Sequence, residues 1–144
     1  MRFLGLALAG LLALTGTAGV AAPEADIVVQ GGIERAEIER ILRADNVDTS
    51  RLSEREVAEI IRGVERGRAP EDFWVAYQAH VLAWKRLAAA VEKAGGRSGE
   101  SRFEESELLN AQLAIEATFD EVERIARAYG ARLPTPAWSI PETV

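Results

Sequence analysis

The chain has 144 residues, with 17 Lys and Arg, 23 Asp and Glu, one His and no Cys. A net charge of -6 argues against a nucleic-acid binder, because such proteins neutralise phosphate with a basic face. The lack of Cys excludes disulfides, thiolate metal sites and cysteine nucleophiles. An apolar content of 48% argues against a wholly disordered chain, and the length predicts one domain.

Residues 1–21 have the pattern of a secretory signal peptide. Arg2 supplies a short positive segment, an apolar run extends from Phe3 to Leu14, and small residues lead up to Ala21. The run is short for a membrane-spanning helix and is rich in Gly and Ala. We therefore expect cleavage after Ala21 and a bacterial protein that is periplasmic or secreted. Once the signal is removed, we expect no attachment to a membrane.

The remainder of the chain predicts an all-α fold, a small bundle of three to four helices with a long antiparallel helical hairpin. Residues 22–32 are expected to form a flexible lead, and residues 33–130 the helical bundle domain. Residues 131–144 contain three prolines and are expected to form an extended tail.

Local signals predict the first two helices. Apolar residues at helical spacing indicate a helix over 33–44, directly after Gly31 and Gly32. Ser53 followed three positions later by Glu56 matches a capping box, which predicts the start of the second helix. Gly67 is expected to end that helix.

The third predicted helix, over 70–94, carries the longest regular apolar pattern. Pro70 is favoured in a first turn, and Glu71 and Asp72 suit the positive end of the helix dipole. Successive residues of this apolar seam are alternately four and three positions apart, a spacing typical of a helix packed against another helix. The seam consists of Phe73, Tyr77, His80, Trp84, Leu87 and Val91.

A Gly-rich loop at 95–100 connects this helix to a fourth predicted helix over 101–129. Gly130 is expected to end the fourth helix in the left-handed conformation. Because the loop is short, the two helices are expected to pack as an antiparallel hairpin with their apolar faces together.

His80 is the single histidine, and it lies on the apolar seam between Tyr77 and Trp84. A protein zinc site needs further ligands, and the sequence has no Gly-x-Ser-x-Gly motif for a serine nucleophile. We interpret His80 as a packed histidine and predict no catalytic residue and no cofactor. The alternative is an enzyme that uses His80 in a cleft.

The segment 45–56 resembles the EF-hand calcium loop. Asp45, Thr49 and Glu56 stand at its ligand positions 1, 5 and 12. Val47 stands where an oxygen ligand is needed, and position 6 lacks the usual Gly. The resemblance implies a calcium-responsive helical protein as an alternative, whereas the capping box explains Glu56 without any metal.

Two tryptophans outside the seam, Trp74 and Trp138, are candidates for a partner surface, because exposed Trp is enriched where proteins bind one another.

The leading interpretation is an exported helical module with a non-catalytic binding or structural role. Its partner is an unidentified protein or small ligand, and not a nucleic acid. The calcium-responsive protein and the His80 enzyme remain the alternatives.

Overall fold

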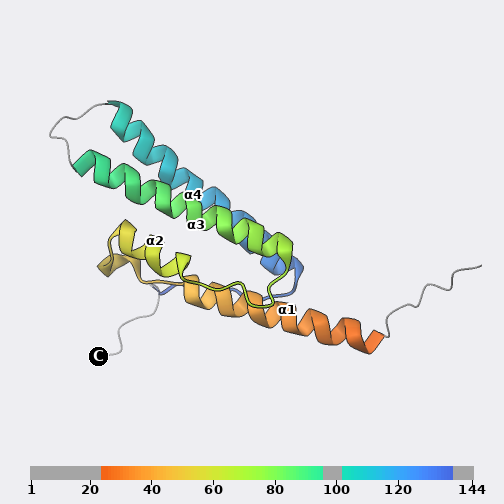
Figure 1. The fold of residues 1–144 in the computed structure, drawn as a ribbon. Helices are drawn as coiled ribbons and strands as arrows, with labels where there is room; N and C mark the ends of the chain where they lie inside the picture. The colour runs from red at the N-terminus through yellow and green to blue at the C-terminus, as the bar shows by residue number, and fades with distance from the viewer. Residues whose placement is uncertain (1–23, 96–101, 138–144) are drawn as a thin grey trace, which may run out of the picture.

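The computed structural model describes residues 24–95 and 102–137, which form α-helices, one short 3-10 helix and no β-strand (Figure 1). The all-α prediction is therefore confirmed. The expected signal peptide at 1–21, most of the Gly-rich loop and Trp138 lie outside the described residues. The elements are α1 (Glu24–Asp45), η1 (Thr49–Arg51), α2 (Glu54–Arg62), α3 (Glu71–Gly95) and α4 (Arg102–Ala128).

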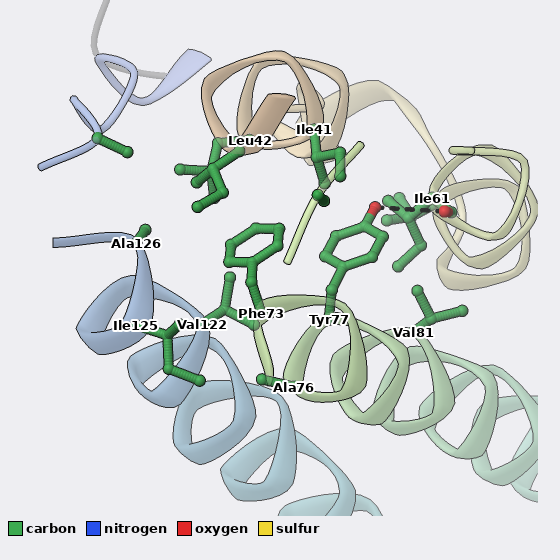
Figure 2. Close-up of a cluster of buried hydrophobic side chains, with 14 residues drawn as sticks. Ile41, Leu42, Ile61, Phe73, Ala76, Tyr77, Val81, Val122, Ile125 and Ala126 are labelled. Atoms are coloured by element: carbon green, nitrogen blue, oxygen red, sulfur yellow. Dashed lines mark hydrogen bonds between the residues drawn. The ribbon is translucent and has the colours of Figure 1, made fainter. Parts of the chain in front are cut away.

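The helices α3 and α4 lie side by side as the predicted antiparallel hairpin, and α1 and α2 follow one another along one side of it (Figure 1). The core lies where α1, α2, α3 and α4 converge. Figure 2 shows Phe73 and Tyr77 of α3 between side chains of the other helices. The largest fully buried side chains are Tyr77, Phe73, Ile38, Ile41, Leu42, Ile61 and Val122.

The helix α1 begins at Glu24, so the expectation of a flexible lead over 22–32 is wrong from Glu24 onward. Gly31 and Gly32, the expected boundary before the first helix, both lie inside it. A helical Gly costs only about 1 kcal/mol relative to Ala, which neighbouring turns can offset. Gln30 Nε2 donates to Glu34 Oε1 at 3.3 Å and so connects the turns on either side of the glycines.

The start of α2 has the predicted capping box. The Ser53 hydroxyl accepts from the Glu56 backbone N–H at 3.3 Å, and the Glu56 carboxylate accepts from the Ser53 backbone N–H at 2.8 Å. The predicted end at Gly67 is wrong, because α2 ends at Arg62 with Gly63 as its cap. Gly67 instead lies in the following loop at φ 56°, a left-handed conformation that favours glycine.

The end of α4 is the predicted left-handed glycine cap. Gly130 has φ 70°, its N–H donates to Arg127 O at 2.9 Å, and the Ala131 N–H donates to Ala126 O at 3.0 Å. These two bonds form the Schellman arrangement, which satisfies carbonyls that the helix leaves unpaired. The chain then turns back toward α1. In the part of the chain that is described, no helix combines the length and the apolar character needed to cross a membrane.

Candidate functional site

A cavity of about 440 Å³ lies among the end of α1, the loop after it, α3, α4 and the returning tail. This volume is in the range of small-molecule sites, which are typically concave and mostly apolar. Polar side chains from three segments reach it, among them Asp45, Thr49 and His80. The apolar part of the wall includes Leu42, Val57, Trp84, Ile115, Phe119 and Leu133.

The tail forms one wall of the cavity because Asn46 holds it at two points. The Asn46 Nδ2 donates to Thr135 O at 2.8 Å, and the Ala137 backbone N–H donates to Asn46 Oδ1 at 3.0 Å. One amide side chain therefore satisfies a backbone acceptor and a backbone donor of the tail. Leu133 and Pro136, which line the cavity, are kept in place by these bonds.

His80 lies on α3 and lines the cavity, and its side chain is buried. Its Nε2 accepts a hydrogen bond from Trp84 Nε1–H at 3.1 Å, and its Nδ1 lies 3.1 Å from Thr118 Oγ1. The Thr118 hydroxyl donates to Ala114 O at 2.7 Å, so its oxygen is available to accept from Nδ1–H. This network assigns the neutral, Nδ1-protonated form of the ring.

Burial lowers the pKa of His80 to about 4, which agrees with a neutral ring at pH 7. The ring also packs against Phe119, at 5.1 Å between ring centroids, and against the edge of Trp84. The structure thus places His80 in the packed position expected from the seam. Both ring nitrogens are engaged within the protein, so neither is directed at a molecule in the cavity.

Asp45, the last residue of α1, is the unusual group of this site. Its side chain is only 8% exposed, and its Oδ2 lies 3.8 Å from His80 Nε2. Its Oδ1 is buried and has no hydrogen-bond partner among the described residues. Burial raises the pKa of Asp45 to about 6, although a hydrogen bond with Tyr77 opposes this rise. At pH 7 the carboxyl group is therefore mostly ionised inside a largely apolar environment.

The Tyr77 hydroxyl has a single hydrogen for two acceptors. It lies 3.3 Å from the backbone oxygen of Ile61, a contact drawn as a dashed line in Figure 2, and it also interacts with the Asp45 carboxylate. Burial and the nearby negative charge of Asp45 raise the pKa of Tyr77, so the hydroxyl stays protonated. One shared hydrogen leaves the Asp45 charge poorly compensated.

The three calcium candidates do not form a common ligand set in the described residues. The Asp45 carboxylate faces His80, whereas the Glu56 carboxylate accepts hydrogen bonds from Ser53 at the start of α2. Thr49 lies in η1 between them. Across residues 24–95 and 102–137, no group of three or more His, Cys, Asp or Glu side chains is suited to hold a metal ion.

Trp74, one of the two candidates for a partner surface, is half-buried. Its ring stacks on Tyr77 with 5.6 Å between the centroids, and it packs against the core cluster. This placement explains Trp74 as part of the fold. Trp138, the other candidate, is outside the described residues.

The proximity of Asp45 to His80 was not predicted from the sequence. One signal for it was present, because Asp45 continues the buried stripe of α1 that contains Ile38, Ile41 and Leu42. A residue three or four positions beyond buried apolar residues lies on the same helix face. The burial of Asp45 was therefore predictable, although its partner on α3 was not.

Comparison of this chain with protein-family models, with curated proteins and with solved structures gives no match. Any function proposed for it therefore comes from the chemistry of its own residues.

Proposed function

We propose that this protein is an exported helical module with a non-catalytic binding role, and that its ligand is a small, largely apolar molecule held in the cavity beside α1, α3 and α4. The supporting observation is the cavity itself. Its volume of about 440 Å³, its mainly apolar wall and its few inward polar groups are the features of small-molecule binding sites.

The arrangement of His80 favours binding over catalysis. A general base must come within hydrogen-bond reach of the proton that it takes. The Nε2 of His80 accepts from Trp84, and its Nδ1 is bonded to Thr118. A base role for His80 would first require one of these bonds to break, whereas a role in shaping the cavity needs no change.

A variant that fills the cavity tests the proposal. Ile115 is half-buried on the cavity wall, whereas Ala117 is exposed on the same helix. We expect 2-phenylethanol, titrated by calorimetry, to bind the wild type and Ala117→Trp. We expect Ile115→Trp to bind it roughly tenfold more weakly or worse, because the indole displaces the ligand. Circular dichroism shows whether both variants are folded.

Two results would contradict this assignment. Unchanged binding by a folded Ile115→Trp variant would place the ligand elsewhere. Binding only after Trp138→Ala would show that the tail of the chain, and not a separate ligand, occupies the cavity.

The proposed export is tested separately, by measuring the intact mass of the protein. Protein recovered from the periplasm or the culture medium is expected to lack residues 1–21, so its intact mass is that of a chain beginning at Ala22. Full-length protein retained in the membrane fraction would overturn the export proposal and leave the cavity proposal unaffected.

A further inference from the structure

The charges around the cavity are all of one sign among the described residues that line it. They comprise the carboxylates of Asp45, Glu116 and Glu123, and no Lys or Arg. Glu123 is paired with Arg127 at 2.8 Å, and Glu116 is exposed to solvent. Asp45 is therefore the one buried carboxylate of this wall, and an anionic ligand would be repelled by it.

The Asp45 carboxylate has unused capacity to accept hydrogen bonds. An ionised carboxylate offers about four acceptor positions, and buried charges are normally paired. No Lys or Arg of the described residues forms an ion pair with Asp45, and its Oδ1 has no partner. The nearby Nε2 of neutral His80 carries no proton, because it accepts from Trp84. The missing partner is thus a positively charged hydrogen-bond donor.

The remainder of the wall suits the apolar body of such a donor. Trp84 and Phe119 contribute aromatic rings, which attract cations placed over their faces. Leu42 and Leu133 contribute aliphatic surface on the α1 and tail sides of the cavity. A primary ammonium group supplies one positive charge and three donors, which matches what the carboxylate lacks.

From these observations we infer that the cavity selects organic amines with an apolar body and that Asp45 recognises their ammonium group. This inference rests on the proposed small-molecule binding function and specifies its ligand class. It requires the ammonium to approach Asp45 from the cavity that this residue lines, and the buried Oδ1 to become accessible when the amine binds.

Three probes of similar size separate charge from shape: 2-phenylethylamine, 2-phenylethanol and 3-phenylpropionate. Calorimetric titration of the wild type at pH 7.5 is expected to show the amine binding roughly tenfold more tightly than the alcohol, because a charged hydrogen bond replaces a neutral one. The carboxylate is expected to bind most weakly. Asp45→Asn should remove the preference for the amine, so that this variant binds the amine and the alcohol with similar affinity.

Asp120→Asn is the matched control. It removes the same charge from an exposed position on α4 that does not line the cavity, and we expect it to keep the wild-type preference. Equal binding of amine and alcohol by the wild type, or a preference that persists in Asp45→Asn, would overturn the amine inference while leaving the cavity function intact. Failure of all three probes to bind would instead overturn the proposed function, and the inference with it.

Discussion

Replacing Phe73 with alanine is expected to destabilise the protein by about 3–5 kcal/mol, a large part of the roughly 5–15 kcal/mol that holds a domain of this size. Phe73 is fully buried on α3, between Leu42 of α1 and Val122 of α4 (Figure 2). Truncation removes the buried ring and leaves a cavity where three helices meet. The expected loss therefore includes both the transfer free energy of the ring and the cost of the cavity.

Urea denaturation followed by circular dichroism measures this loss. Val75→Ala is the control, because Val75 lies two positions along the same helix and is 58% exposed. We expect that variant to stay within about 0.5 kcal/mol of the wild type. Trp84→Ala should cost less than Phe73→Ala, because Trp84 is half-buried and faces the cavity. A loss below about 1 kcal/mol for Phe73→Ala would contradict the position of the core.

The second large effect is a pair of opposite pH dependences for Asp45→Asn and His80→Gln. Folded Asp45 keeps its proton up to about pH 6, whereas the unfolded side chain loses it near 3.8. Folded His80 binds a proton only near pH 4, whereas the unfolded side chain binds one near 6.5. Each difference corresponds to about 3 kcal/mol.

The signs of the two contributions are opposite. A raised Asp45 pKa gives stability that is present at low pH and lost as the pH rises through 6. A lowered His80 pKa gives stability that is present above about 6.5 and lost as the pH falls toward 4. In the wild type the two proton counts nearly cancel between pH 4 and pH 6, so this pair contributes an almost level profile.

Each substitution removes the contribution of one residue to the pH dependence of stability, so the variant shows the contribution of the other residue. We expect Asp45→Asn to be about 3 kcal/mol more stable than the wild type at pH 7 and to lose that advantage by pH 4. The stability of His80→Gln relative to the wild type should rise by about 3 kcal/mol over the same acidification. Gln is chosen because its side-chain oxygen can still accept from Trp84.

Denaturant titrations at pH 4, 5, 6 and 7 measure these differences. Other carboxylates whose pKa values are lowered by hydrogen bonds, such as Glu39 and Glu121, change the stability of all three proteins together, so each variant is compared with the wild type at the same pH. Parallel stability profiles for the three proteins would contradict the assigned protonation states.

A more stable Asp45→Asn variant would also connect stability with ligand binding. The structure keeps an ionised group where an amide of the same shape is expected to be more favourable for folding. A group that is unfavourable for folding is typical of functional sites. If the substitution also removes the preference for amines, the same carboxylate accounts for both observations.

Features that depend on residues within one or two helical turns could be predicted from the order of amino acids alone. The α3 seam with Phe73 and Tyr77, the capping box at Ser53 and the glycine cap at Gly130 all appear where they were predicted. Apolar spacing and capping chemistry act locally, so they are visible in the order of residues. The start of α1 was missed because propensity at Gly31 and Gly32 is only a weak preference.

The surroundings of Asp45, in contrast, depend on how distant parts of the chain pack together. The sequence alone suggested Asp45 as a calcium ligand and His80 as an isolated packed residue, yet the two lie 3.8 Å apart. Their approach depends on how α1 packs against the α3–α4 hairpin, and the cavity beside them depends on Asn46 holding the tail. These contacts join segments that are distant along the chain, and no local pattern encodes the direction from which a distant helix or tail arrives.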